Sequence, residues 1–378
     1  MKPNSVKGFQ DFSSDEAEKR AEIKKILIEI FEKYGFEPAE TPVIEYEEFV
    51  KGENTSDEAV SDIFKLQDKG KRKLALRYEF TFQLKRLMKN KKLPYKRYQI
   101  GPVFRDEPAT SNRFRQFTQC DVDIVGSTTK DEAEILALSS EILRNLKIQP
   151  MIFVNNRKLL NEILEENKVK EKDKENVLRE IDKYDKIGEK QVKKNLKKYN
   201  AEKIIDCLKK GEKYFDKFDS YKEIISLIEY CRAYGFEIKF SPTIVRGLSY
   251  YNGNVFEIKT KTMKETITAG GSFMFEGVQC TGISFGLERL TKLAKIKSEK
   301  QRIMIVSIGQ DRAAIKLAQK LRKNKKIVLL YYGKPSKSLQ CCNSKNIDKV
   351  IFVGDKEVRA KKFKIKDLKS GKESVLKI

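Results

Sequence analysis

The stretch RYQIGPVFRDEPATSNRFRQFTQCDVDIVG, from Arg97 to Gly126, predicts two long strands joined by a loop. We expect the first strand from Tyr98 to Arg105 and the second from Arg113 to Val125. Pro108 and Ser111-Asn112 carry the turn signals between them. The two faces of the second strand then indicate what the sheet can hold.

Side chains alternate across a strand, so the second strand has an apolar face and a polar face. The apolar face, with Cys120, Val122 and Ile124, is expected to point into a core. The polar face carries Arg113, Arg115, Phe117, Gln119, Asp121 and Asp123. A solvated surface and a salt-bridge ladder are the two plain alternatives. Because apolar segments flank the strand, we favour a central position and a floor for an anionic and zwitterionic ligand.

Composition limits the class of protein. The chain has 378 residues, enough for two or three domains. Its 79 Lys and Arg against 55 Asp and Glu give a net charge of +24, which favours RNA, DNA or a membrane surface as partner. A lysine-biased proteome would explain part of this excess. Six cysteines without a CxxC pair indicate reduced packing thiols rather than disulfides or zinc ligands.

No apolar run reaches the roughly 18 residues of a membrane-spanning helix, so we expect no membrane partner. The N-terminal MKPNSVKGFQDF has no apolar signal region, so we expect a cytoplasmic protein. Histidine is absent from the chain. Its absence removes the commonest general base and metal ligand, so we expect no protein metal site and a chemistry of carboxylates, arginines and positioning.

The run FRDE, a short loop and RFRQFTQCDVD resemble motif 2 of class II aminoacyl-tRNA synthetases, and most closely the histidyl-tRNA synthetase family. Helix signals after a capping box at Ser13–Glu16, then a strand from Phe36 to Glu45 containing Pro42, resemble motif 1 and imply a homodimer. An ordinary amphipathic helix with an edge strand explains motif 1 equally well. GISFGLERL, Gly282 to Leu290, is similar to motif 3, where Glu288 would orient Arg289 or bind metal.

Two further stretches resemble this family in particular. LALRYEFT, Leu74 to Thr81, predicts a strand running into a helix over 82–88 and is similar to the family's LRPEGT, with Tyr78 and Phe80 in place of proline and glycine. VRGLSYYNGNVFEIK, Val245 to Lys259, is similar to RGLDYYxxxVFE, with Ser249 in place of the aspartate. AGGS at 269–272 departs from the family's AGGRYD.

The resemblance implies an α+β catalytic domain, an antiparallel sheet flanked by helices, with a helical insertion and a C-terminal α/β anticodon-binding domain. We expect catalytic parts at 1–153 and 236–298, the insertion at 154–235 and the anticodon-binding domain at 299–378. A helix is expected from Thr128 to Leu146, and βαβα alternation with a terminal hairpin after Glu299. Solvated helix faces explain each basic cluster on the insertion better than tRNA contact does, although the resemblance raises tRNA as the alternative. The cluster at Lys356–Lys364 fits RNA phosphates, and simple solubility explains it nearly as well.

The implied activity is ATP-dependent ligation of L-histidine to tRNA(His) through a histidyl-adenylate, with ATP and Mg²⁺ as cofactors. The resemblance places ATP at Arg105, Glu107, Arg113, Arg115, Phe117 and Arg289. It places histidine at Glu79, Thr81, Gln119, Asp123, Arg246, Tyr250 and Tyr251. Arg105 and Arg246 would do the catalytic work at the α-phosphate.

Two alternatives stay open at this point. A synthetase-like sensor or regulatory subunit would bind tRNA or a partner enzyme without catalysis, although the motif arginines and the C-terminal domain favour the enzyme. A class II enzyme for threonine, proline or glycine would share the C-terminal domain, but Asp123 with Tyr250-Tyr251 argues against it. A chain free of histidine could also be made when histidyl-tRNA is scarce; drift in a lysine-biased genome is the alternative.

Overall fold

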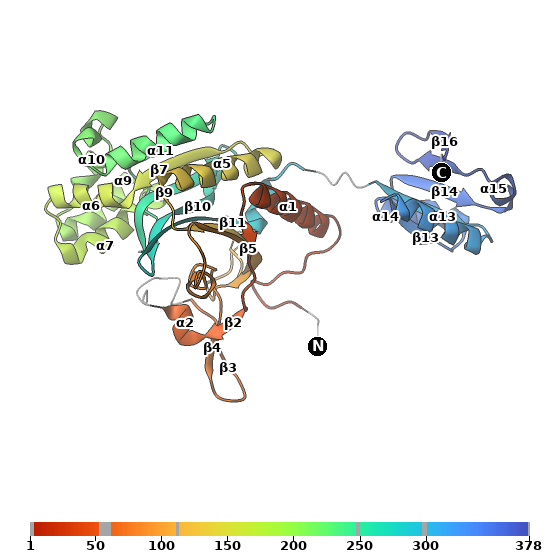
Figure 1. Cartoon of the computed structure of the whole chain (residues 1–378), viewed down its shortest axis with the longest axis horizontal. Helices are drawn as coiled ribbons and strands as arrows, with labels where there is room; N and C mark the ends of the chain where they lie inside the picture. Colours follow the sequence, from red (N-terminus) through yellow and green to blue (C-terminus); the bar gives the residue numbers. More distant parts are fainter. Residues whose placement is uncertain (1–3, 53–61, 111–112, 247–249, 297–300, 377–378) are drawn as a thin grey trace. The chain divides into compact units, whose positions relative to one another are not determined.

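The computed structural model describes residues 4–52, 62–110, 113–246, 250–296 and 301–376, so the expected turn at Ser111-Asn112 and the position of Ser249 lie outside the described residues. The chain divides into two compact units, Met1–Ile296 and Lys297–Ile378, each described here by itself (Figure 1). No helix in the described part of the chain has the length and apolar character needed to cross a membrane.

The described residues of the first unit build an eight-stranded sheet in the order β1-β5-β6-β11-β10-β9-β7-β8. The pairings from β5 through to β7 are antiparallel, and the short edge strands β1 and β8 pair parallel. In sheet order the bounds are Glu37–Pro38, Tyr95–Phe104, Gln116–Val125, Val278–Gly286, Met263–Phe275, Tyr251–Thr260, Met151–Asn156 and Lys239–Phe240. The expected antiparallel sheet is confirmed.

Helices α1 (Ser14–Lys33), α5 (Thr129–Asn145) and α12 (Leu287–Leu293) cover one face of this sheet. Ile23, Leu27 and Phe31 of α1 recur at helical spacing and are fully buried. Cys120, Val122 and Ile124 of β6 are fully buried in the same cluster, as their alternation predicted. The expected capping box at Ser13 is wrong, because that side chain makes no capping bond; α5 has one, between Thr128 and Asp131.

Some predicted strand limits are wrong. The second strand begins at Gln116 rather than Arg113, because the backbone of Arg113 pairs with Thr110 and the Arg115 N–H donates to the Gly8 carbonyl. The expected strand over 36–45 splits into β1 and β2 (Ile44–Tyr46), with Pro42 between them. β2 joins β3 (Lys65–Gln67) and β4 (Lys73–Leu76) in a small antiparallel sheet. The helix expected over 82–88 shortens to α4, Leu84–Leu87, and α2 spans Glu47–Lys51.

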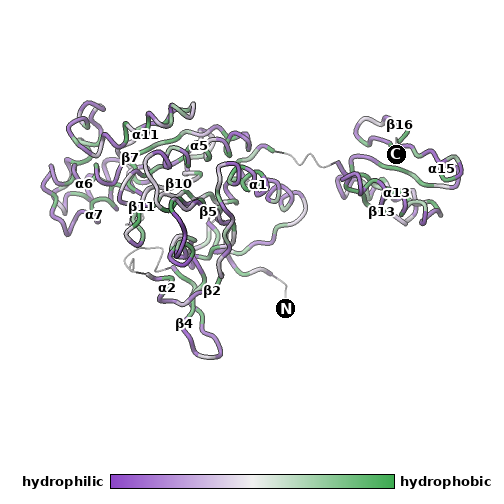
Figure 2. The backbone as a smooth tube through the Cα atoms, in the orientation of Figure 1, coloured by the Kyte–Doolittle hydropathy of each residue, from purple (hydrophilic) through white to green (hydrophobic). Residues whose placement is uncertain are grey.

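Residues 157–233 form short helices, as the lysine- and glutamate-rich pattern predicted. These are α6 Arg157–Glu166, α7 Glu171–Ile181, α8 Tyr184–Ile187, α9 Glu189–Leu196, η1 Lys197–Tyr199, α10 Ile204–Leu208, η2 Glu212–Lys217 and α11 Tyr221–Ala233. Hydrophobic and hydrophilic positions alternate along them (Figure 2). Their apolar side chains join the core of the large sheet, so this segment belongs to the first compact unit.

The second unit alternates strands and helices as expected. Its elements are β12 Arg302–Ser307, α13 Asp311–Lys323, β13 Ile327–Tyr331, α14 Pro335–Ser344, β14 Lys349–Val353, α15 Asp355–Ala360, β15 Lys364–Asp367 and β16 Glu373–Val375. β13, β12 and β14 pair in parallel, and β15 and β16 add the antiparallel hairpin. Helix α15 was not expected from the sequence. Apolar side chains pack on both faces of the sheet.

Candidate active site

A cleft of about 480 Å³ lies over the polar face of the large sheet. Its lining brings together almost all residues expected to bind ligand: Glu79, Thr81, Arg105, Glu107, Arg113, Phe117, Gln119, Asp123, Arg246, Tyr250, Tyr251 and Arg289. Asp121 and Glu288 line it as well. The alternation of β6 explains this, because Phe117, Gln119, Asp121 and Asp123 share the face opposite the core.

Arg115 is the expected ATP ligand that does not line this cleft among the described residues. Its guanidinium pairs with Asp106, and its Nε donates to the Glu107 carbonyl oxygen at 3.2 Å. Its backbone N–H donates to the Gly8 carbonyl at 2.9 Å, outside the β5–β6 ladder. Since β6 begins one residue later, strand alternation does not govern this side chain. Arg115 braces the loop before β6.

Arginines gather at one end of the cleft. The pKa of Arg289 is lowered by burial and by the neighbouring charges of Arg113, Arg246 and Arg105. Its Nη1 donates to the Thr266 carbonyl at 2.6 Å, which fixes the side chain. The Arg105 guanidinium lies 5.1 Å from the ring centre of Phe117. Mutually repelling cations beside an aromatic ring form a site for a polyanion that carries a planar ring.

Glu257 supports this end and was not expected from the sequence. It accepts from Arg246 Nη1 at 2.9 Å and from the Thr266 hydroxyl at 2.9 Å. Burial opposes the charge of Arg246, but Tyr251 and Glu257 outweigh it and raise the pKa of Arg246. Arg246 has φ +62°, a backbone conformation that costs a non-glycine residue about 1–3 kcal/mol. The strain is consistent with a side chain held where a ligand needs it.

Buried carboxylates and the phenols of Tyr250 and Tyr251 line the other end of the cleft. Asp123 is buried, and its Oδ2 lies 2.6 Å from Nη2 of the fully buried Arg97. Asp121 accepts from the Ser284 hydroxyl at 2.5 Å, and burial together with Asp123 raises the pKa of Asp121 to about 7. Burial likewise raises the pKa of Asp123, while Arg97 lowers it. Arg97 was not expected as a site residue, and Asp121 was expected only on the polar floor; the predicted strand limits would have placed Arg97 opposite Asp121, two residues out of the observed register with Asp123.

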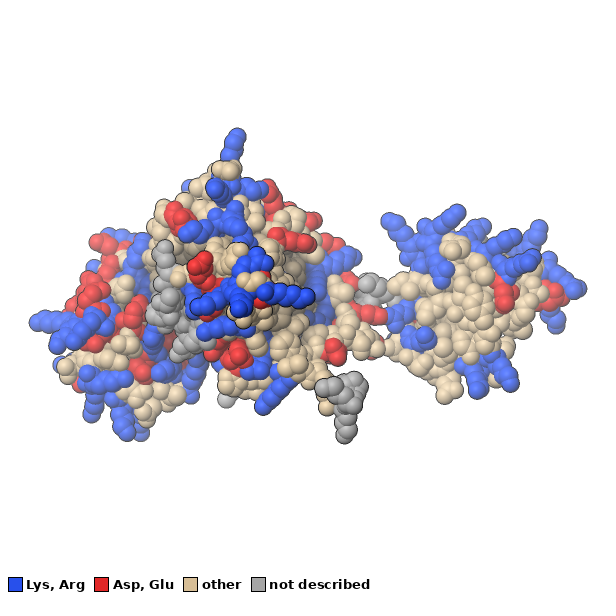
Figure 3. Space-filling model, turned by 90° about the horizontal axis from the view of Figure 1, so that it is seen from below, with Lys and Arg blue, Asp and Glu red and all other residues tan. Residues whose placement is uncertain are grey.

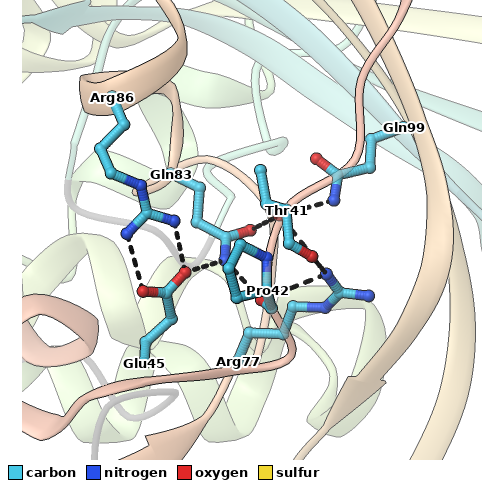
Figure 4. A network of polar contacts seen from close by, with 7 residues as sticks. All are labelled: Thr41, Pro42, Glu45, Arg77, Gln83, Arg86 and Gln99. Carbon is cyan, nitrogen blue, oxygen red and sulfur yellow. Dashed lines mark hydrogen bonds and ion pairs between the residues drawn. The ribbon is translucent and has the colours of Figure 1, made fainter.

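The segment that carries Glu79 and Thr81 is held at both ends by a polar network (Figure 4). Before it, Arg77 donates to the carbonyl oxygens of Thr41 at 2.6 Å and Pro102 at 2.8 Å. After it, Gln83 donates to Glu45 at 2.6 Å, and Arg86 forks onto the same carboxylate at 2.6 and 2.7 Å.

The unusual aromatic residues in this segment serve packing. The ring of Tyr78 stacks on Phe82 at 5.9 Å, with an interplanar angle of 17°. Phe80 is fully buried, and the Arg77 guanidinium lies 4.7 Å from its ring centre. Gly101 leaves the space for both, because a Cβ there would meet Arg77 at 2.7 Å.

The AGGS segment has its own partners. Ser272 donates to the buried carboxylate of Glu132, whose other oxygen accepts from Asn254 at 2.6 Å. Burial raises the pKa of Glu132 to about 7. Gly270 faces the Gly282 carbonyl so closely that a Cβ would come within 2.0 Å of it. A neutral hydrogen-bond donor, Ser272, therefore stands where the resembled sequence has an arginine.

Glu288 links three elements at the base of the cleft. Its Oε1 accepts from Arg20 at 2.9 Å and from the Thr118 backbone N–H at 3.1 Å. It therefore orients the start of α12 rather than the guanidinium of Arg289. No group of three or more Asp, Glu or Cys side chains suited to a metal occurs in the described ranges. A cation at this end would come with its anionic ligand, as Mg²⁺ does with nucleotide phosphates.

Comparison with known proteins identifies the family. Residues 8–290 match the family model for histidyl-tRNA synthetase, and residues 301–378 match the anticodon binding domain. A histidine--tRNA ligase 1 of Bacillus cereus is 34% identical over 413 aligned positions, covering 99% of this chain and 97% of the relative.

Solved structures agree with this match. A histidyl-tRNA synthetase from Nostoc sp. PCC 7120 superimposes with a TM-score of 0.88 at 25% identity, over 100% of this chain and 97% of that one. An ATP phosphoribosyltransferase regulatory subunit/histidyl-tRNA synthetase from Bacillus halodurans shares the fold, with a TM-score of 0.80 at 22% identity over 93% and 98% of the two chains. The chain belongs to the histidyl-tRNA synthetase family.

Proposed function

We propose that this protein ligates L-histidine to tRNA(His) with ATP, by way of a histidyl-adenylate. One observation carries the proposal: a single cleft has arginines for a triphosphate at one end and buried carboxylates and phenols for an imidazole at the other. The family match over nearly the whole chain supports the same reaction.

Activation requires positioning rather than a base, because the histidine carboxylate is already ionised at neutral pH. That carboxylate attacks the α-phosphorus of ATP, the new O–P bond forms, and the bond to pyrophosphate breaks. Arg105 and Arg246 neutralise the charge at the α-phosphate and align the carboxylate. Arg113 and Arg289 hold the outer phosphates, and the ring of Phe117 offers a stacking face for adenine with Glu107 as acceptor for its amino group.

Mg²⁺ fits this end of the cleft only as a companion of the triphosphate. Glu288 is the candidate ligand that the resemblance indicated, and its oxygens already accept hydrogen bonds from Arg20 and Thr118. The phosphates would therefore supply most of the ligands. When bound, Mg²⁺ supplies neutralisation of phosphate charge beyond what the arginines give.

Histidine recognition divides between two groups of residues. Glu79, Thr81 and Gln119 accept the three donors of the ammonium group. Asp123 accepts an imidazole N–H, and Tyr251 offers a polar partner to the other ring nitrogen. A site that bonds both ring nitrogens rejects apolar isosteres by a factor of roughly 10⁴, because its buried polar groups would be left unpaired.

Transfer then needs tRNA, whose terminal ribose hydroxyl attacks the histidyl carbonyl and displaces AMP. The C-terminal unit fits an RNA partner, because lysines and arginines outnumber acidic side chains on the face seen in Figure 3. We place the protein in the cytoplasm as a homodimer. The half-exposed Ile44 and Tyr46 of β2 are apolar side chains that a second copy would cover.

Exchange of labelled pyrophosphate into ATP tests the proposal, with each of the standard amino acids supplied in turn. Exchange that depends on histidine alone is expected. Arg246→Ala should abolish it, whereas Arg359→Ala, an exposed arginine of the second unit paired with Asp355, should leave it unchanged because activation needs no tRNA. Exchange with another amino acid would reassign the specificity, and exchange with none would indicate a sensor.

A further inference from the structure

Arg97 of β5 is a fully buried arginine that lies behind the cleft rather than in its lining. Its Nη2 lies 2.6 Å from Oδ2 of Asp123 and donates to the Phe80 carbonyl oxygen at 3.2 Å. Phe80 stands between Glu79 and Thr81, two of the three residues proposed to hold the substrate ammonium group. One guanidinium therefore touches both halves of the amino-acid site.

The sheet confines the Asp123 carboxylate between two neighbours. Arg97 and Asp123 are directly opposite in the β5–β6 ladder, so their side chains leave the sheet on the same face. On the other side, Gly282 of β11 is opposite Asp123, and a Cβ there would come within 2.1 Å of Oδ1. The absence of a side chain at Gly282 and the presence of Arg97 together set where the carboxylate can lie.

Fold stability alone does not account for Arg97. A buried ion pair adds little to stability, because desolvation of the two charges offsets their attraction, and an apolar pair of similar volume serves as well or better. In addition, the Nε and Nη1 of Arg97 have no hydrogen-bond partner among the described residues. A charge kept in so unfavourable a place points to a requirement of the site.

We propose that Arg97 is a positioning residue for histidine: it fixes the Asp123 carboxylate against the imidazole and ties it to the Glu79–Thr81 segment. The inference rests on the proposed function. It adds a residue that touches no substrate and acts through two groups that do.

The charges around Asp123 agree with this role. The titratable groups that face it are Asp121 on its own strand, Arg97 of β5, Cys280 of β11 and Tyr251 of β9. Burial raises the pKa of both aspartates, and Arg97 is the group that lowers both. Without Arg97, nothing among these neighbours favours the ionised carboxylate that accepts an imidazole N–H.

Steady-state pyrophosphate exchange of the full chain distinguishes a positioning role for Arg97 in histidine binding from a purely structural role. Arg97→Met should raise KM for histidine at least about 30-fold and leave KM for ATP within about twofold, because the arginine end of the cleft is untouched. Arg97→Lys keeps the positive charge but loses the planar guanidinium, and it should recover part of the affinity for histidine. Arg157→Met is the matched control, since Arg157 is also buried and paired, with Glu175, but lies in α6 away from the cleft.

The outcomes are distinguishable from failure of the proposed function, which would show as an unaltered protein without histidine-dependent exchange. If the unaltered protein is active and Arg97→Met keeps its histidine KM within about threefold, the inference is overturned. It is equally overturned if the KM values for histidine and ATP rise together. Should Arg97→Met fail to fold, Arg97→Lys decides by the same criterion, with a rise in the histidine KM alone as support.

Discussion

The two ends of the cleft differ in how their charges are balanced before any ligand binds. At the nucleotide end, Arg289 is surrounded by other arginines, which lower its pKa together with burial. At the amino-acid end, the buried Asp123 already has its counter-charge in Arg97, 2.6 Å away. The first end is completed by an anionic substrate, whereas the second is complete before any ligand arrives.

This difference indicates how one sheet serves two substrates. Neighbouring arginines repel one another and bind a triphosphate strongly, because the ligand removes the repulsion. A small zwitterion offers little charge, so its site depends on fixed and desolvated partners. Substitutions at the two ends should therefore differ in which KM they change and in what they do to the unliganded protein.

The largest effect is expected at Asp123. Asp123→Asn keeps the shape but removes the anionic acceptor and the ion-pair partner of the buried Arg97. We expect kcat/KM for histidine to fall by about 10³-fold or more, with ATP binding nearly unchanged. Exchange kinetics and ATP titration measure the two effects. Asp219→Asn, at an exposed carboxylate of the first unit, is the control; a loss below about tenfold at Asp123 would contradict the prediction.

Arg289→Ala should have the next largest effect, and here the kinetics with ATP should change rather than those with histidine. Loss of one fixed cation is expected to lower kcat/KM for ATP by roughly 10²-fold with little change in KM for histidine. Because neighbouring arginines repel Arg289, the unliganded variant should melt no lower than the parent. Arg322→Ala provides a comparison, since Arg322 likewise donates to a backbone carbonyl, at 2.9 Å, but in the second unit. If Arg289→Ala lowered the affinity for histidine as much as that for ATP, the two ends of the cleft would not act separately on the two substrates.

Gly282→Ala should affect the amino-acid end alone, with a smaller loss of histidine affinity than Asp123→Asn. The added Cβ would come within 2.1 Å of Asp123 Oδ1, so the carboxylate must move. A displacement of about 1 Å can cost up to 10²-fold, and we expect a 10- to 100-fold rise in KM for histidine. Gly211→Ala, where a Cβ meets nothing within 4 Å, is the control. Unchanged kinetics in Gly282→Ala would show that the carboxylate position is not critical.

Glu132→Gln should change stability rather than activity. Burial raises the pKa of Glu132 from 4.5 to about 7, so the folded protein keeps a proton that the unfolded chain releases between these values. The stability of the parent therefore falls as pH rises through this window, by about 3 kcal/mol from this group. In the variant, the free energy of unfolding should lack this contribution to its pH dependence. The variant should therefore be more stable than the parent at pH 8. Urea unfolding at pH 5 and pH 8 measures it, and identical slopes would contradict the assignment.

Period-two alternation predicted the core face of β6 and most of the cleft floor, because sheet geometry fixes which side chains share a face. It failed at Arg115, whose backbone N–H donates to Gly8 outside the ladder and whose side chain pairs with Asp106. It failed again near Pro42, where side chains of Arg77 and Gln83 take the carbonyl bonds that a ladder would use. Local sequence carries no signal for bonds to residues so far away along the chain.

The residues that sequence reasoning missed share this property. The role of Arg97 follows only from its register with Asp123, and that of Glu257 from its ion pair with Arg246. Ser272 and Glu132 are bonded across 140 positions of sequence. Motif resemblance found the groups expected to touch substrate, whereas the groups that hold them in place required the packed structure.

Calorimetric titration at two ionic strengths measures the contrast between the ends directly. With ionic strength raised from about 0.05 to 0.3 M, Kd for histidine without nucleotide should stay within about twofold, because its site is buried and already paired. Kd for ATP over the same range should rise about tenfold, since salt screens the attraction between the triphosphate and the neighbouring arginines of its site. Histidine that binds only after ATP, or affinities that weaken in parallel, would contradict a preformed amino-acid site.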